Sequence, residues 1–290
     1  MSTGIGIDSF SYHRFFGDIG PTDQPSSIRW TARDFLSRAH ELGVDAVSLQ
    51  TTYLPELDPD IIASLGRQLN EFGLEVVLAW GHPSGLENGD RPEKAEAIRR
   101  LLPVAKTLGC SLLRFVTGNF LSFKFSAPER IERLTPIIRD ITTTAADYDL
   151  TLAIENHGDF AMKDLLELVE GVDMKNLGIC FDAMNAVRVG DDLMEAAAMA
   201  ATYIRMVHVR DHLPLSESPV KVESFWPSAP LGHGQLDIEG VIRFLEADGY
   251  AGNLFIEMGY MHPDFSDEDA AVAESVAYLK KTIQNKGEQL

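Results

Sequence analysis

The sequence has few cysteines, few basic residues and no long apolar run, and each scarcity excludes a class of protein. Its two cysteines, Cys110 and Cys180, both lie in apolar stretches, so we expect no disulfide framework and a reducing compartment. Lys and Arg number 25 against 44 Asp and Glu, and the formal charge of -19 would repel the phosphates of nucleic acids or anionic lipids. No apolar run approaches the ~20 residues that span a bilayer. We therefore expect neither a nucleic-acid partner nor a membrane partner.

The composition that remains is that of a globular protein. Of the 290 residues, 45% are hydrophobic and 24% are charged, which is enough for a large core. Near the amino terminus, Asp8, His13 and Arg14 interrupt the apolar segment that a secretory signal requires. We expect a soluble cytoplasmic protein that forms a single domain over residues 1–290.

A helix end followed by a strand occurs four times in the first half of the chain. The copies are ELGVDAVSL (41–49), EFGLEVVLA (71–79), TLGCSLLRF (107–115) and DYDLTLAIE (147–155). Gly43, Gly73 and Gly109 stand where a helix end favours a left-handed residue, and Asp149 takes that place in the fourth copy. The repeat predicts that helices and strands alternate along the chain.

Between these copies the apolar residues recur with a period near 3.6, which predicts amphipathic helices that cover a sheet. Pro103 and Pro136 lie within two of these patterns, so we expect kinks or late starts in those helices. The alternation continues with strand-like segments over 4–9, 176–182, 204–210 and 253–258, and with helical segments over 193–201, 238–247 and 267–284.

Eight strand–helix units with short, apolar strands predict a parallel sheet buried on both faces and closed into a (β/α)8 barrel. The alternative is an open, doubly wound sheet. Its phosphate-binding glycine pattern after the first strand is missing, because Gly4 and Gly6 lie within that strand. The sequence therefore favours an α/β fold with one closed barrel.

Polar residues stand at or near the ends of four consecutive apolar strands: Glu155, Asp182, His208 and Glu257. In such a barrel the active site lies at the carboxyl ends of the strands, where these side chains would converge. Carboxylates gathered there would repel one another without a cation. Three carboxylates and one imidazole match one divalent metal, with Mn²⁺ expected first and Mg²⁺, Co²⁺ or Zn²⁺ as alternatives. Each residue alone could be a helix cap, a turn residue or a core residue.

Five further residues are candidates for substrate contact: Arg114, His82, Gln50, Arg210 and Trp226. The first three end strands, and Arg210 shares the parity of His208. Trp226 lies in the stretch 211–237, which is too long for a simple connection and is interpreted as a substrate-covering loop that also holds Lys221, Phe225 and His233. A structural ion pair is an equal alternative for Arg114, and a subunit contact is one for Trp226.

His157 is a candidate acid or base. It follows Glu155 by two residues, so in an extended strand end both side chains point toward the same side. An imidazole titrates near neutral pH and could serve as a second acid or base beside the glutamates. A hydrogen bond from His157 to the neighbouring loop is the alternative.

The chain resembles the xylose isomerase-like barrel superfamily, which includes D-tagatose 3-epimerase-type sugar epimerases and inositol-catabolism isomerases and dehydratases. The resemblance rests on AIENHGD (153–159), GICFDAMN (178–185), MVHVRD (206–211), LGHGQLDIEGVIRFLEADGYAG (231–252) and LFIE (254–257). It implies that Glu155, Asp182, His208 and Glu257 bind one divalent metal and that the two glutamates act as acid and base beside a carbonyl. Asn185 departs from the pattern, because sugar epimerases tend to have histidine there.

These features lead us to expect a metal-dependent isomerase or epimerase that acts on a small ketose or oxo-sugar through an enediolate. One alternative is a metal-dependent lyase that dehydrates, decarboxylates or eliminates from a 3-oxo-glycoside, with His157 as the acid. Another is a sugar-binding barrel without catalysis. A nuclease on this fold is disfavoured by the negative charge and by the small number of histidines at strand ends. The resemblance also implies a homo-oligomer.

Overall fold

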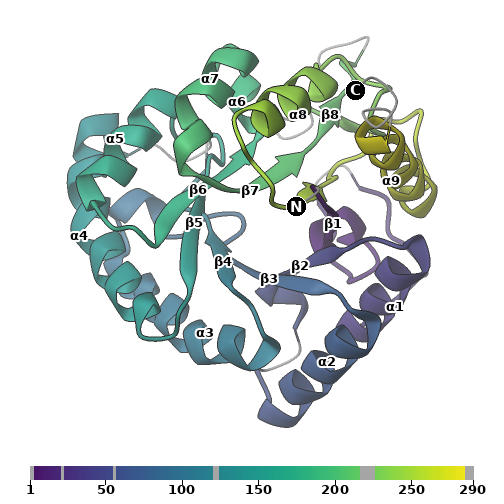
Figure 1. Cartoon of the computed structure of the whole chain (residues 1–290), viewed down its shortest axis with the longest axis horizontal. Helices are drawn as coiled ribbons and strands as arrows, with labels where there is room; N and C mark the ends of the chain where they lie inside the picture. Colours follow the sequence, from purple (N-terminus) through teal and green to yellow (C-terminus); the bar gives the residue numbers. More distant parts are fainter. Residues whose placement is uncertain (1–2, 21–22, 55–56, 120–123, 216–225, 285–290) are drawn as a thin grey trace.

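The computed structural model describes residues 3–20, 23–54, 57–119, 124–215 and 226–284. Within this part, eight parallel strands close into a barrel with helices around the outside (Figure 1). The strands are β1 (Ile5–Asp8), β2 (Ala46–Gln50), β3 (Glu75–Trp80), β4 (Leu112–Phe115), β5 (Thr151–Glu155), β6 (Leu177–Asp182), β7 (Ile204–Val209) and β10 (Leu254–Ile256). Strand β1 pairs in parallel with both β2 and β10, so the sheet has no open edge. The prediction of a closed (β/α)8 barrel is confirmed.

The helices alternate with the strands along most of the chain. They are α1 (Ala32–Leu42), α2 (Pro59–Phe72), α3 (Ala95–Leu108), α4 (Ala127–Ala146), α5 (Met162–Val172), α6 (Ala183–Arg188), α7 (Leu193–Ala200), α8 (Ile238–Ala247) and α9 (Glu268–Gln284). Helix α6 was not expected from the sequence. Two short strands, β8 (Asp211–His212) and β9 (Ser228–Ala229), form a small antiparallel pair after β7. Within the described residues, no helix is both long and apolar enough to cross a membrane.

The expected left-handed residues are found where helices give way to strands. Gly43, Gly73 and Gly109 end α1, α2 and α3 with φ of 62°, 67° and 86°. Asp149 adopts a φ of 56° just before β5. A residue without a side chain, or with a short polar one, tolerates this conformation, and this explains the repeat.

The expectation of late starts at the two prolines is wrong. Pro103 lies inside α3 and Pro136 lies inside α4, and both helices begin well before them. Both prolines are on exposed faces of their helices. A proline frees the carbonyl four residues earlier, and on a solvent-facing surface water can satisfy that carbonyl. The helices therefore continue through both positions.

The barrel interior consists of an apolar layer with a polar layer above it. The apolar layer contains Ala46, Val77, Leu112, Ala153, Cys180, Met206 and Phe255, one buried residue from each of seven strands. On β1 the corresponding residue is Gly6, whose position is filled by Phe255: a Cβ there would lie 2.5 Å from the ring. Because side chains alternate along a strand, residues two positions later face the same interior at the carboxyl ends. This alternation places the polar residues on the floor of the barrel mouth.

Candidate metal centre

Glu155, Asp182, His208 and Glu257 meet at the carboxyl ends of β5, β6, β7 and β10. Each follows an apolar interior residue by two positions on its strand: Ala153, Cys180, Met206 and Phe255. All four side chains are buried, and one ligand atom from each lies within 4.8 Å of the others. The structure thus brings together the four residues that the sequence singled out as metal ligands.

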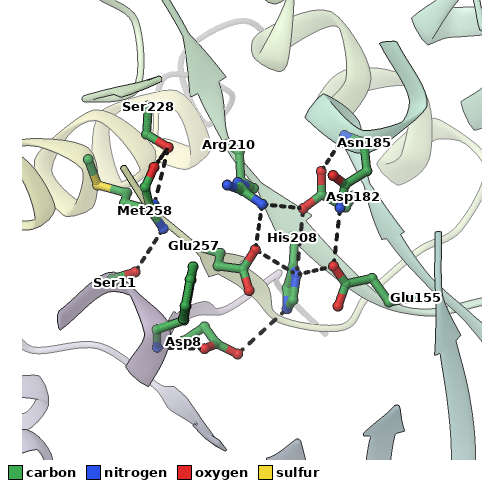
Figure 2. A network of polar contacts seen from close by, with 12 residues as sticks. Asp8, Ser11, Glu155, Asp182, Asn185, His208, Arg210, Ser228, Glu257 and Met258 are labelled. Carbon is green, nitrogen blue, oxygen red and sulfur yellow. Dashed lines mark hydrogen bonds and ion pairs between the residues drawn. The ribbon is translucent and has the colours of Figure 1, made fainter. Parts of the chain in front are cut away.

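His208 stands at the centre of this cluster. Its Nδ1 atom lies 3.8 Å from Glu155 Oε1, 3.8 Å from Asp182 Oδ2 and 3.5 Å from Glu257 Oε2 (Figure 2). Neither ring nitrogen has a hydrogen-bond partner among the described residues, although the side chain is fully buried. A buried nitrogen without a partner, surrounded by three carboxylate oxygens, fits a divalent cation.

The charges at the barrel mouth also fit a cation. Four buried carboxylates, those of Asp8, Glu155, Asp182 and Glu257, share two guanidinium groups. Arg114 contacts Glu155 at 3.2 Å, Asp8 at 3.4 Å and Glu257 at 3.8 Å. Arg210 contacts Glu257 at 2.9 Å and Asp182 at 3.4 Å. These carboxylates outnumber the two guanidinium groups that pair with them, and a divalent ion would offset the excess of negative charge.

The same imbalance alters proton affinities. Burial by itself lowers the pKa of His208, but the carboxylates of Glu257 and Glu155 outweigh burial and raise that pKa well above its ordinary value. Burial raises the pKa of Asp182, yet Arg210 and His208 reverse this effect and lower it to about 2. The raised pKa favours a protonated His208 imidazole, whose positive charge lies where a metal ion would supply it.

Local structure holds Asp182 in place. It ends β6 and caps α6, where its Oδ1 accepts a hydrogen bond of 2.7 Å from the Asn185 backbone N–H. The Asn185 side chain donates to Glu155 Oε1 at 3.2 Å, so the asparagine found in place of the usual epimerase histidine links two ligands. The Asn156 side chain donates to the Asp182 carbonyl at 2.8 Å and accepts from the Asp182 backbone N–H at 2.7 Å.

Asp8 belongs to the site but was missed by the sequence analysis. It ends β1, is fully buried and lies 3.8 Å from His208 through its Oδ2 atom. The sequence pattern could have identified Asp8, because this residue follows Gly6 by two positions and ends an apolar strand, as the other carboxylates do. Gln50, a predicted substrate contact, is buried and donates to Asp8 Oδ1 at 3.3 Å.

The predicted substrate contacts Arg114 and Arg210 both have carboxylate partners within the site, in agreement with the ion-pair alternative for Arg114. Direct contact of either guanidinium with substrate remains a prediction. Burial lowers the pKa of Arg114, but Glu155, Asp8 and Glu257 reverse this and raise it. Both guanidinium groups therefore stay charged beside the candidate metal ligands.

His157 and His82 lie beside each other, each just after a barrel strand, β5 and β3. Their rings meet edge to face with centroids 5.4 Å apart, and Phe10 lies 4.5 Å from His82. The Nδ1 atom of His157 lies 2.9 Å from the carbonyl oxygen of Gly118, which is the loop contact considered as the alternative. Burial lowers the pKa of both histidines. Both rings are therefore neutral near pH 7.

The stretch 211–237 is only partly described. The Trp226 ring packs against His212 with centroids 4.8 Å apart, and β8 pairs with β9. His233 bonds to Glu274 on α9 at an exposed position. Lys221 and Phe225 lie outside the described residues.

Two curated relatives share part of the sequence. The uncharacterized protein YihM of Escherichia coli is 26% identical over 164 residues, covering 57% of this chain and 46% of that protein. The 3-oxo-isoapionate decarboxylase of Pectobacterium atrosepticum is 26% identical over 172 residues, covering 59% and 60%. The chain thus matches less than two thirds of the length of these relatives.

Solved structures share the fold over nearly the whole chain. A xylose isomerase domain protein from Planctomyces limnophilus has 22% identity and a TM-score of 0.74, covering 98% of this chain and 99% of that chain. An L-ribulose 3-epimerase has 19% identity and a TM-score of 0.75, covering 99% and 97%. The IOLI protein, solved with a zinc atom, has 15% identity and a TM-score of 0.74, covering 98% and 99%.

A family comparison extends this likeness to the sequence. Residues 36–282 match the model of the family described as xylose isomerase-like TIM barrel. This range includes all four residues of the candidate metal centre and seven of the eight barrel strands. The motifs quoted from the sequence lie within the same range. Because the family model matches most of its length and its closed barrel agrees with that match, the chain belongs to the xylose isomerase-like TIM barrel family.

Proposed function

We propose that this chain is a divalent-metal-dependent sugar isomerase or epimerase that transfers a proton next to a carbonyl through an enediolate. The observation that carries this proposal is the convergence of Glu155, Asp182 and Glu257 on the Nδ1 atom of His208. Membership of the family and the likeness to an L-ribulose 3-epimerase support a sugar substrate.

Glu155, Asp182, His208 and Glu257 would hold the metal ion. Their oxygen-rich set favours Mn²⁺, with Mg²⁺, Co²⁺ or Zn²⁺ as alternatives. When bound, the ion would polarise the substrate carbonyl and its neighbouring hydroxyl and so lower the free energy of the enediolate.

The two glutamates are placed to move the proton. They lie on non-adjacent strands, β5 and β10, on two sides of His208 (Figure 2). Arg114 and Asn185 hold Glu155 through contacts of 3.2 Å to its two oxygens. Arg210 holds Glu257 through Oε2 at 2.9 Å. One carboxylate would remove a proton from carbon, and the other, in its protonated form, would donate its own proton to the opposite face.

A lyase is the second candidate, and the neutral pair His82 and His157 favours it. Elimination or decarboxylation starts from the same enolate but needs an additional group that handles a proton at the departing position. His157 follows Glu155 by two residues and packs against His82, and both histidines follow the carboxyl ends of barrel strands, where we expect the active site. The likeness to a decarboxylase also supports this candidate.

The experiment is to incubate the manganese-loaded protein with a panel of small ketoses and oxo-sugars in D₂O. An isomerase or epimerase incorporates solvent deuterium next to the carbonyl. Its product has the same molecular formula as the substrate, apart from the exchanged hydrogen. His157→Ala should leave both events largely intact, because Glu155 and Glu257 carry out the transfers.

The outcomes separate the candidates. Deuterium uptake that survives His157→Ala while product formation collapses would contradict the epimerase and favour the lyase. A barrel that only binds sugar would show ligand binding without deuterium uptake. Glu155→Gln is the matched control for His157→Ala, because it removes one of the two proposed bases but retains an oxygen that can contact the ion.

A further inference from the structure

We propose that Asp8 is a positioning residue that orients His208 for metal binding by accepting a hydrogen bond from the Nε2–H group. This inference rests on the proposed metal centre and adds a residue that is not one of its four ligands. It predicts that the affinity of the site for metal depends on a carboxylate at the end of β1.

The two nitrogens of His208 face different partners. Nδ1 points toward Glu155, Asp182 and Glu257, whereas Asp8 lies at the other edge of the ring, with Oδ2 3.8 Å from Nε2 (Figure 2). A neutral imidazole that binds a metal through one nitrogen carries its proton on the other. With Nδ1 turned to the ligand carboxylates, the proton belongs on Nε2, where it faces Asp8.

The Nε2–H group needs an acceptor, because His208 has no exposure to solvent. A buried donor without a partner is destabilising, because it has lost its hydrogen bond to water. The separation of 3.8 Å exceeds a hydrogen bond of roughly 2.9 Å, so the ring and the carboxylate must approach by about 1 Å. We expect this approach to accompany binding of the ion.

Asp8 is held by donors from three neighbouring elements. Its Oδ1 accepts from the Phe10 backbone N–H at 2.8 Å and from Gln50 Nε2 at 3.3 Å. Its Oδ2 accepts from the Ser48 hydroxyl and lies 3.4 Å from Arg114 Nη2. These contacts fix the direction of the carboxylate before any ion binds.

Cys180 is the competing partner for His208. Its sulfur belongs to a buried group with Glu155 and His208 whose ligand atoms lie within 4.8 Å of one another. Cys180 is a buried free cysteine. A thiol is a weak acceptor, whereas a carboxylate forms a charge-assisted hydrogen bond. Asp8 is therefore the stronger partner for Nε2–H.

The test compares wild type with Asp8→Asn by calorimetric titration of the full chain with Mn²⁺ alone. We expect the variant to bind about 10- to 100-fold more weakly, as is typical when a group supporting a ligand histidine is lost. Nitrogen-15 histidine spectra of the zinc-loaded protein give a second measurement. A hydrogen bond to Asp8 predicts a slowly exchanging Nε2 proton on His208 in wild type and a faster exchange in Asp8→Asn.

Three further variants isolate the cause. Ser48→Ala removes one donor to Asp8 without changing the charge, and we expect a smaller loss of affinity in the same direction. Asp23→Asn makes the same chemical change in a carboxylate that bonds a different buried histidine, His13, at 2.8 Å, and should leave the metal affinity unchanged. Cys180→Ala should leave the exchange of the His208 proton slow.

Unchanged metal affinity and unchanged proton exchange in Asp8→Asn would overturn the proposal. If Asp8→Asn does not fold, unchanged affinity and unchanged exchange in Ser48→Ala would overturn it. A weakened affinity with unaltered exchange would also overturn it, because removal of charge alone would explain that result. Rapid exchange in Cys180→Ala would assign the hydrogen bond to the thiol. Because these titrations contain no substrate, wild type that binds Mn²⁺ but converts no sugar would contradict the proposed function alone.

Discussion

The Nδ1 atom of His157 lies 2.9 Å from the carbonyl oxygen of Gly118, and this contact determines which nitrogen carries the proton. A carbonyl can only accept, so Nδ1 donates and Nε2 of the neutral ring is an acceptor. Burial lowers the pKa of His157 from its ordinary value, which keeps the ring neutral near pH 7. Nε2 of His157 can therefore accept a proton, or a hydrogen bond from a substrate hydroxyl, but it carries no proton to donate.

This tautomer predicts the pH dependence of His157→Ala. If the protein is the lyase and His157 acts as its base, removal of His157 should lower turnover by about 10²-fold or more. The ratio of wild-type to variant rate should be constant above about pH 6.5, the ordinary histidine pKa, and should shrink at lower pH as the ring becomes protonated. Rates measured from pH 5 to 8 check this. A ratio that grows toward acid pH would show that His157 donates a proton, as first expected for a lyase.

Glu257→Gln should abolish turnover more thoroughly than it weakens metal binding. The amide keeps an oxygen near the ion but cannot accept the proton, and the loss in kcat should be about 10²-fold or more. Manganese titration and steady-state rates on the same preparation measure the two effects. Glu155→Gln should behave in the same way if both faces of the substrate are used. Near-normal turnover of Glu257→Gln with metal bound would contradict its role as a base.

Removal of the metal should lower the stability of the protein, because the buried carboxylates in the barrel mouth would lose a counterion. Elemental analysis of protein never exposed to a chelator should find about one divalent ion per chain. At an ion concentration of 100 Kd, binding stabilises the folded state by about 2.7 kcal/mol. Thermal unfolding before and after chelation, and after readdition of Mn²⁺, measures the effect. A Tm unchanged by chelation, with no ion found, would contradict the metal centre.

Arg114→Met should destabilise the metal-free protein by about 3–5 kcal/mol, because it leaves buried carboxylates without their cation. The Arg114 side chain is 1% exposed and contacts Asp8, Glu155 and Glu257. Denaturant unfolding of the metal-free protein measures this loss.

Arg99→Met is the matched control for this measurement, since it breaks the surface pair of Arg99 with Asp140. Such a pair contributes about 0–1 kcal/mol. Equal effects of the two substitutions would show that the Arg114 contacts do not stabilise the fold.

The sequence alone was sufficient for the architecture and for the four central residues of the site. The helical period, the glycines at positions 43, 73 and 109 and the short apolar strands depend on local backbone preferences, which are visible in neighbouring residues. The convergence of Glu155, Asp182, His208 and Glu257 followed from one rule, that the carboxyl ends of barrel strands meet on one face.

Only the tertiary structure decided how these groups are partnered. That Arg114 pairs with Glu155, that Arg210 pairs with Glu257 and that Asp8 faces His208 depend on distances between strands far apart in the sequence. Prolines 103 and 136 are tolerated within helices because packing turns them toward solvent. The tautomer of His157 is fixed by Gly118, 39 residues away, because a hydrogen bond depends on position in space and not on separation along the chain.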